Sequence, residues 1–226
     1  MSEQQPETIQ QKIKQLATQA IKQSNPSSWF EVLYAESQGD ANQVPWANLT
    51  PHPYLQNWLN TYPHTRDKPS ALVIGCGLGD DAEALAKHEF HVTAFDISPT
   101  AVTWCQQRFP DSAVTYMVAD LFAIPTQWQQ AFDLVFECRN IQALPLNVRS
   151  LVIESVASMV AVGGTLLIIT GFRETEAEPD GPPWFVSESE LTQFTAWGLT
   201  EISRLPFLES HKQHLRIEYR RELSTK

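Results

Sequence analysis

The chain has 226 residues, of which 42% are hydrophobic, and its formal net charge at pH 7 is -10. A chain of this length and composition can bury one substantial core, which predicts a single compact domain. The acidic charge and the absence of any run of Lys and Arg disfavour nucleic acid as a partner, because phosphate recognition relies on clustered cations.

Cysteine usage and the N-terminal sequence predict the compartment. Cys76, Cys105 and Cys138 have neither CxxC spacing nor an accompanying His cluster, so we expect reduced thiols and no metal site. The N-terminus lacks a basic start followed by an apolar run, and no stretch of about 18 apolar residues occurs. We therefore expect a cytoplasmic protein that does not bind membranes and acts as a monomer or a weak homodimer.

Residues 1–60 are rich in Gln, Pro and Trp and predict an N-terminal helical extension. Apolar residues recur at helical spacing in its first part: Ile9, Ile13, Leu16 and Ala20. This pattern predicts an amphipathic helix that begins near Pro6. Ser28 and Glu31 have the spacing of a capping box and predict a second helix. The extension either forms a lid over a ligand or simply packs against the rest of the domain.

From residue 70 onward, short β-rich runs alternate with helical segments, a pattern typical of βαβ units and a parallel sheet. The expected strands are Ser70–Gly75, His91–Asp96, Val114–Val118, Phe132–Phe136, Thr165–Gly171, Thr200–Leu205 and His214–Arg220. The expected helices lie around 80–88, 99–108, 147–161 and 187–197, and the third of these is predicted to end at Gly163-Gly164. We predict an α/β, Rossmann-like fold over residues 61–226, with a seven-stranded mixed sheet, helices on both faces and a terminal antiparallel hairpin.

The first predicted strand runs directly into a glycine-rich loop, ALVIGCGLGDD. Gly75, Gly77 and Gly79, with Cys76 between the first two, allow a ligand to approach the backbone where the strand ends and a helix begins. A tight strand-to-helix turn is the structural alternative. The loop indicates a nucleotide-like ligand.

Asp80 and Asp81, directly after the loop, discriminate between possible ligands. A dinucleotide places its pyrophosphate at the positive end of this helix, where two carboxylates would repel it. The NAD fingerprint also requires glycine at position 80. S-adenosylmethionine has no phosphate and carries a sulfonium and an ammonium, so it is compatible with acidic neighbours. A nicotinamide-dependent oxidoreductase is the disfavoured alternative.

Two further acids follow predicted strands. Asp96 ends the second strand, where a carboxylate can accept hydrogen bonds from both ribose hydroxyls. Asp120 follows the third strand, where it can accept from an adenine amino group while the backbone of Leu121 meets a ring nitrogen and Ile97 packs on the ring. Either aspartate alone can also be a helix N-cap.

Together these motifs resemble the class I S-adenosylmethionine-dependent methyltransferases over residues 70–220. Within that class the chain is similar to the thiopurine S-methyltransferase family, which includes halide and thiol methyltransferases. PWANLTPHP resembles the family's Pro-Trp segment, which implies that Trp46 lines the donor pocket, although Leu49 and Ala47 replace the family's glycine and acid. GCGLGDD matches the family's glycine loop, with Asp81 as its acidic residue.

Two later segments carry the same resemblance. FDLVFECRNIQALP is similar to the family's fourth strand and turn, which implies that Glu137 faces the methyl donor. Arg139 and Asn140 replace the aromatic and small residues that often follow in halide and thiol enzymes. GPPWFVSESEL matches the Gly-Pro-Pro-aromatic segment after the fifth strand and places Trp184 at the acceptor pocket or in the loop's anchor.

Methyl transfer from a sulfonium uses an activated donor, so positioning and exclusion of water dominate the catalysis. Glu137 is a candidate base, donor support or partner of Arg139, and Arg139 is a candidate contact of an anionic substrate. Asn140 is assigned to the substrate pocket. The sequence shows no His near a motif, which favours an easily ionised acceptor, a thiol or a halide. O- or N-methylation of a small metabolite, and a regulatory protein that binds the donor without turnover, stay open.

Overall fold

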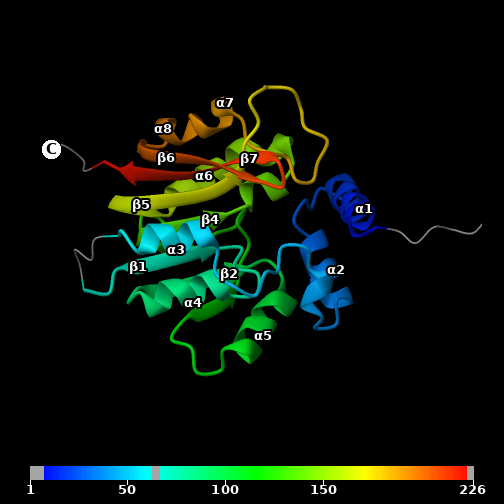
Figure 1. Cartoon of the computed structure of the whole chain (residues 1–226), viewed down its shortest axis with the longest axis horizontal. Helices are drawn as coiled ribbons and strands as arrows, with labels where there is room; N and C mark the ends of the chain where they lie inside the picture. The colour runs from blue at the N-terminus through cyan, green and yellow to red at the C-terminus, as the bar shows by residue number, and fades with distance from the viewer. Residues whose placement is uncertain (1–7, 63–66, 223–226) are drawn as a thin grey trace, which may run out of the picture.

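A computed structural model describes residues 8–62 and 67–222 and contains one seven-stranded sheet in the order β3-β2-β1-β4-β5-β7-β6 (Figure 1). The strands are β1 (Ser70–Ile74), β2 (His91–Asp96), β3 (Thr115–Val118), β4 (Phe132–Cys138), β5 (Val160–Gly171), β6 (Leu199–Glu209) and β7 (Lys212–Arg221). The first five pair in parallel, whereas β7 is antiparallel to both β5 and β6. This topology confirms the predicted mixed sheet with a terminal antiparallel hairpin.

Helices cover both faces of the sheet, as predicted. On β1, Ala71 and Val73 belong to one apolar cluster and Leu72 and Ile74 to another, because successive side chains of a strand point to opposite faces. The first cluster is completed by α3 (Pro53–Leu59), α4 (Asp80–Lys87) and α5 (Pro99–Arg108). The second is completed by α6 (Arg149–Ser158), α7 (Glu188–Leu191) and α8 (Gln193–Ala196). None of the helices in the described ranges has the length and apolar character needed to cross a membrane.

Two predicted helix boundaries were wrong. Gly163-Gly164 does not end a helix: α6 ends at Ser158, and β5 already begins at Val160. Gly163 has a φ of 75°, and a Cβ on Gly164 would lie 2.9 Å from two backbone oxygens, so the pair lets β5 bend closely past its neighbours. The helix expected over 187–197 is two short helices separated at Thr192, of which the first has a capping box formed by Ser187 and Glu190.

The predicted N-terminal extension contains α1 (Ile9–Lys22), α2 (Trp29–Glu36) and the 3-10 helix η1 (Ala41–Gln43) before α3, which packs on the sheet. Helices α1 and α2 lie at one end of the sheet (Figure 1). Helix α1 is capped by Thr8 and Gln11, and Pro6, where it was predicted to begin, lies outside the described residues. The amphipathic helix itself is confirmed.

The capping box predicted for α2 is wrong. Ser28 has helical backbone angles, and its hydroxyl donates to the carbonyl of Asn25 instead of capping the helix. The carboxylate of Glu31 accepts from the hydroxyls of Ser98 (2.5 Å) and Thr100 (2.7 Å) at the start of α5. Burial alone would raise the pKa of Glu31, but these hydrogen bonds outweigh it and lower the pKa. Glu31 therefore attaches the extension to the sheet domain.

We predict that Glu31→Gln lowers the free energy of unfolding by about 1–2 kcal/mol, because it removes the charge from these hydrogen bonds. Ser28→Ala should have almost no effect, since its hydroxyl makes only a local contact near the surface. Urea denaturation of both variants at pH 7 measures the difference. A larger loss for Ser28→Ala than for Glu31→Gln would contradict this assignment.

Candidate active site

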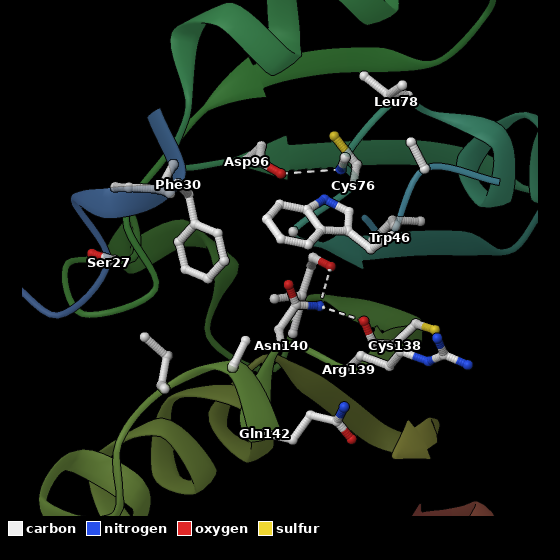
Figure 2. A pocket seen from close by; sticks show the side chains of 18 of the residues that line it. Ser27, Phe30, Trp46, Cys76, Leu78, Asp96, Cys138, Arg139, Asn140 and Gln142 are labelled. Carbon is white, nitrogen blue, oxygen red and sulfur yellow. Dashed lines mark hydrogen bonds between the residues drawn. The ribbon is translucent and has the colours of Figure 1, made fainter. Parts of the chain in front are cut away.

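A cavity of about 360 Å³ lies at the carboxyl ends of the central strands (Figure 2). Its volume is within the range of roughly 300–1,000 Å³ that small-molecule sites occupy. Ten of the predicted site residues line it: Trp46, Gly75, Cys76, Gly77, Asp96, Ile97, Asp120, Leu121, Arg139 and Asn140. The parallel strands explain this convergence, because their carboxyl ends meet at one edge of the sheet.

Three predicted site residues do not line the cavity: Gly79, Glu137 and Trp184. Gly79 has a φ of 91° at the N-cap of α4, and a Cβ there would lie 2.6 Å from the hydroxyl of Tyr116. Its missing side chain therefore allows α4 to pack closely against the sheet. Packing thus accounts for the glycine at position 79.

Glu137 lies behind the cavity wall and is fully buried. Its Oε1 accepts hydrogen bonds from the backbone N–H groups of Asn140 and Ile141 (3.0 Å to the latter), and Oε2 has no hydrogen-bond partner among the described residues. Burial raises the pKa of Glu137 to about 7. In this geometry Glu137 holds the turn after β4 in place and does not face the cavity.

Asn140 links that turn to the glycine loop. Its Nδ2 donates to the carbonyl oxygens of Ile74 (2.8 Å) and Cys138 (3.1 Å), which fixes the orientation of the amide (Figure 2). A Cβ on Gly75 would lie only 1.8 Å from Oδ1 of Asn140, and Gly75 has a φ of 55°. Gly75 is therefore required both for its backbone conformation and for the amide that packs on it.

Asp96 is at the end of β2 and is 6% exposed. Its Oδ2 accepts from the backbone N–H of Gly77 (3.0 Å; Figure 2). Its Oδ1 accepts from the backbone N–H of Ser98 (2.9 Å). Each carboxylate oxygen can accept a further hydrogen bond. Burial raises the pKa of Asp96 to about 6, so the group is mostly ionised at pH 7.

The extension contributes an aromatic wall to the cavity. The indole N–H of Trp46 donates to the hydroxyl of Tyr34 (2.7 Å). The ring of Trp46 meets those of Trp29 and Phe30 edge to face, each at a centroid distance of 5.8 Å. All four aromatic residues line the cavity, and the side chains of Trp29 and Tyr34 are almost fully buried. This wall excludes water from one side of the site.

The two acids at the start of α4 differ in their partners. Asp80 forms a two-point ion pair with Arg108, with distances of 2.8 and 2.9 Å. Asp81 accepts from the backbone N–H of His52 (2.7 Å), and burial raises the pKa of Asp81 to about 6. Because Arg108 compensates Asp80, the negative charge at this end of the cavity comes mainly from Asp81.

The sequence reasoning missed His52, which lines the cavity although no His was expected near a motif. His52 is the N-cap of α3, and its Nε2 lies 3.3 Å from Nη2 of Arg139. Burial and the guanidinium of Arg139 lower the pKa of His52 to about 4, so the imidazole is neutral at pH 7. The signal was present, because His52 lies within the Pro-Trp segment itself.

Arg139 also forms an ion pair with Glu209, and its Nε is buried without a hydrogen-bond partner in the described part of the chain. Trp184 is 8% exposed, but the two preceding residues, Pro182 and Pro183, reach the cavity in its place. Gln142 is a second residue that the sequence reasoning missed: it lines the cavity, and its backbone carbonyl accepts from the backbone N–H of Trp184 (2.7 Å).

Comparison with known proteins identifies the family. The family model of the thiopurine S-methyltransferases matches residues 36–223. The chain belongs to this family. A probable thiol methyltransferase 2 of Arabidopsis thaliana is 32% identical over 163 residues, which cover 69% of this chain and 68% of that protein. A thiopurine S-methyltransferase of Aliivibrio salmonicida is 26% identical over 184 residues, covering 74% and 83% respectively.

Solved structures share the fold. The N-methyltransferase NodS from Bradyrhizobium japonicum, in complex with S-adenosylhomocysteine, superposes with a TM-score of 0.65 at 22% identity and covers 84% of this chain and 98% of that chain. Magnesium protoporphyrin IX methyltransferase from Synechocystis, with bound S-adenosylmethionine, has a TM-score of 0.57 at 17% identity and covers 98% and 87%. The protein is an S-adenosylmethionine-dependent methyltransferase.

The cavity fits this donor. Gly77 lines the cavity without a side chain, and the carboxylate of Asp96 retains acceptor capacity for ribose hydroxyls. The acidic end near Asp81 suits a ligand with a sulfonium and an ammonium. Asp120 lines the same cavity, with Oδ1 accepting from the backbone N–H of Phe122 (2.9 Å). These residues are therefore the expected donor-binding set, together with Trp46, Cys76, Gly77, Ile97 and Leu121.

We predict that Asp96→Asn weakens S-adenosylhomocysteine binding by about 1.5–3 kcal/mol at pH 7, the typical loss for hydrogen bonds to a charged group. In the wild type, affinity should fall as the pH drops below about 6, because burial has raised the pKa of Asp96 to that value and protonation removes an acceptor. Titration calorimetry between pH 5 and 8 measures both effects.

Asp81→Asn is the companion variant, because Asp81 lines the same cavity and its pKa is also raised to about 6. Each variant removes one of the two carboxylates that titrate in this range, so the loss of affinity at low pH should become smaller in both and vanish in neither. If Asp96→Asn binds as tightly as the wild type at pH 7, Asp96 is not a donor ligand.

Proposed function

We propose that this enzyme methylates the sulfur of a small thiol that enters the cavity as a thiolate. The observation that carries the proposal is that, among the described residues, the cavity wall offers no strong base that is free to serve the acceptor. The carboxylates that line the cavity belong to the expected donor-binding set. Glu137 lies behind the wall, and the low pKa of His52 leaves a weakly basic imidazole. Proton removal by such groups would contribute little, so the acceptor must ionise readily. The similarity to a probable thiol methyltransferase supports the same acceptor class.

S-adenosylmethionine supplies a methyl group on a positively charged sulfur, which leaves without help from an acid. The residues of the cavity therefore act by positioning, which can contribute roughly 7–11 kcal/mol. Asn140, held by Glu137 and by two strand-end carbonyls, fixes the part of the cavity where the turn after β4 meets the end of β1, which we call its floor. The aromatic wall excludes water, which strengthens the electrostatic interactions inside the cavity.

Arg139 is the residue best suited to stabilise an anionic acceptor. It lines the cavity, and its buried Nε–H has no acceptor among the described residues. Its ion pair with Glu209 uses Nη2 and leaves Nε available. A thiolate near this N–H would gain a charge-assisted hydrogen bond.

A halide is the second candidate, because it is an anion at every working pH and needs no base. The same argument from Arg139 applies to it, and the similarity to a probable thiol methyltransferase favours the thiolate over iodide. O- or N-methylation would instead require a group that removes a proton. Donor binding without turnover is the remaining alternative, motivated by Ala47, Leu49 and Asn140, which depart from the family pattern.

An acceptor panel tests the proposal. With S-adenosylmethionine, we expect small thiols to be methylated faster than iodide, and iodide faster than phenols or amines of similar size. Release of S-adenosylhomocysteine measures each rate, and titration with S-adenosylhomocysteine establishes that the donor site is intact. Turnover of hydroxyl or amine acceptors alone would overturn the thiol assignment, and tight donor binding without any turnover would favour the regulatory alternative.

Two isosteric variants test the role of the buried acid and the imidazole. Glu137→Gln preserves an oxygen for the two backbone N–H groups, so we expect its rate on thiols to fall by less than roughly 100-fold, the lower limit for losing a general base. His52→Asn retains an N-cap side chain and should also keep most activity. Steady-state rates at saturating donor measure both. Complete inactivity of either variant with its fold intact would identify a true base.

A further inference from the structure

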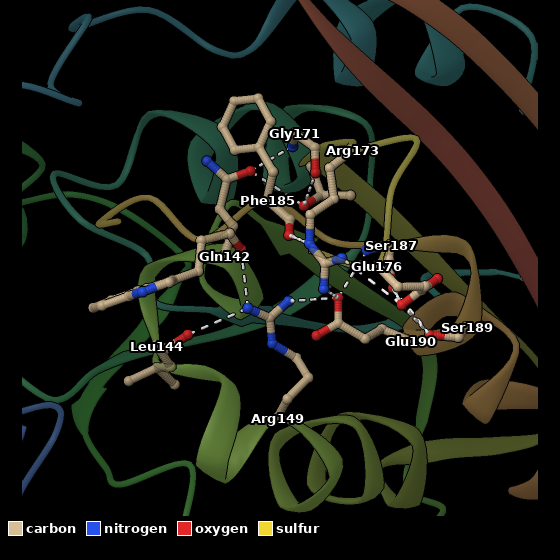
Figure 3. A network of polar contacts seen from close by, with 12 residues as sticks. Gln142, Leu144, Arg149, Gly171, Arg173, Glu176, Phe185, Ser187, Ser189 and Glu190 are labelled. Carbon is tan, nitrogen blue, oxygen red and sulfur yellow. Dashed lines mark hydrogen bonds and ion pairs between the residues drawn. The ribbon is translucent and has the colours of Figure 1, made fainter. Parts of the chain in front are cut away.

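A buried network of charged side chains lies behind the cavity (Figure 3). Its centre is Arg149, the first residue of α6, which is 2% exposed. Nη2 of Arg149 donates to the carbonyl oxygens of Trp184 (2.9 Å) and Leu144 (3.3 Å), and Nη1 lies 3.6 Å from Oε2 of Glu190. Arg149 therefore connects segments that are far apart in the sequence.

Glu190 anchors the loop between β5 and α7 from the same place. Its Oε2 accepts from the backbone N–H of Ser187 (2.7 Å) and from Nη2 of Arg173 (3.0 Å). Nε of Arg173 in turn donates to the carbonyl of Phe185 (2.8 Å). Both ends of the segment 173–187 are thus attached to one buried carboxylate (Figure 3).

The two carbonyls that Arg149 joins belong to opposite parts of the cavity wall. Leu144 lines the cavity at the end of the turn that also contains Asn140 and Gln142. Trp184 directly follows Pro182 and Pro183, which line the cavity from the loop after β5. The hydrogen bonds of one guanidinium, together with the backbone hydrogen bond from Trp184 to Gln142 (2.7 Å), therefore hold these two parts of the wall at their separation.

A buried guanidinium is costly, because its desolvation is only partly compensated by hydrogen bonds and ion pairs. Burial lowers the pKa of Arg149, with Glu190 acting in the opposite direction. Its Nε has no hydrogen-bond partner among the described residues. An apolar side chain would fill this position at lower cost, which indicates that the planar donor group serves the geometry of the wall.

We propose that Arg149 is a positioning residue for the acceptor: it sets the distance between the 140–144 turn and Pro182-Pro183 and thereby determines which acceptors fit. The proposal rests on the proposed function in one respect, that the acceptor occupies this part of the cavity. Gly75 directly follows β1 and Asp96 ends β2, whereas the proline loop reaches the cavity from beyond β5. Donor affinity should therefore not depend on Arg149.

Arg149→Met tests the proposal, and Arg221→Met is a matched control. Like Arg149, Arg221 donates to backbone carbonyls, which here are those of Val160 (2.8 Å), Trp197 (2.8 Å) and Ala157 (2.6 Å). It does not line or adjoin the cavity. We expect Arg149→Met to lower kcat/KM by roughly 10-fold to 100-fold, mainly by raising the KM of the acceptor. A loss of this size is typical when a substrate is held slightly out of position. The Kd of S-adenosylhomocysteine should not change. Arg221→Met should lower the stability of the protein without changing the acceptor KM or this Kd.

A second measurement does not depend on turnover. Glu174, Glu176 and Glu178 lie on the exposed part of the same loop, where a glutamate-specific protease can cut. Release of the loop in Arg149→Met should accelerate cleavage there relative to the wild type and to Arg221→Met. If Arg149→Met does not fold, Arg149→Lys replaces it, because lysine keeps the charge but lacks the planar guanidinium that donates to two acceptors at once. We expect the acceptor KM and the cleavage rate of this variant to rise as well.

The proposal is overturned if the acceptor KM of the Arg149 variant stays at the wild-type value, or if the Kd of S-adenosylhomocysteine rises as much as that KM. Failure of the thiol proposal gives a different result: the wild type then turns over other acceptors or none. If the wild type turns over another acceptor, the KM values of the wild type and the Arg149 variant are compared with that acceptor. If the wild type turns over none, the cleavage rates alone test the proposal, and unchanged cleavage of the variant refutes the role of Arg149.

Discussion

The side-chain amide of Asn140 joins the ends of β1 and β4 through two hydrogen bonds to their carbonyl oxygens. The surrounding features depend on this link. Gly75 must lack a side chain because the amide oxygen occupies that space, and Glu137 is buried without full compensation because it holds the backbone N–H of Asn140. The floor of the cavity is thus built from groups that satisfy one another before any ligand binds, which is the preorganisation that methyl transfer requires.

Features with a local sequence signal were predictable. The order of strands and helices follows from alternating β-rich and helical segments, and Gly75, Gly77 and Asp96 follow from their positions at strand ends. Glu137 shows the limit of such reasoning. Like Asp96 it lies at the carboxyl end of a strand, but β4 continues to Cys138. Successive strand residues point to opposite faces, so Phe136 and Cys138 line the cavity and Glu137 does not.

The roles of Glu31 and His52 were not predicted because they depend on contacts between distant parts of the chain. Glu31 had the spacing of a cap, yet its partners are Ser98 and Thr100, which only the fold brings near. The contact between His52 and Arg139 likewise spans 87 positions. Local propensity carries no information about such pairs, because tertiary contacts override the preferences of a short segment.

The aromatic wall has a consequence for how the cavity of this enzyme can be altered. The family model begins its match at residue 36, whereas Trp29, Phe30 and Tyr34 of the wall precede that point. The sheet supplies Gly75 and Asp96, so changes in α1 and α2 can reshape one side of the cavity while leaving those two residues in place. The helices before residue 36 are in this sense an exchangeable part: a chimera that joins them to the sheet of a relative would vary the wall and keep the floor.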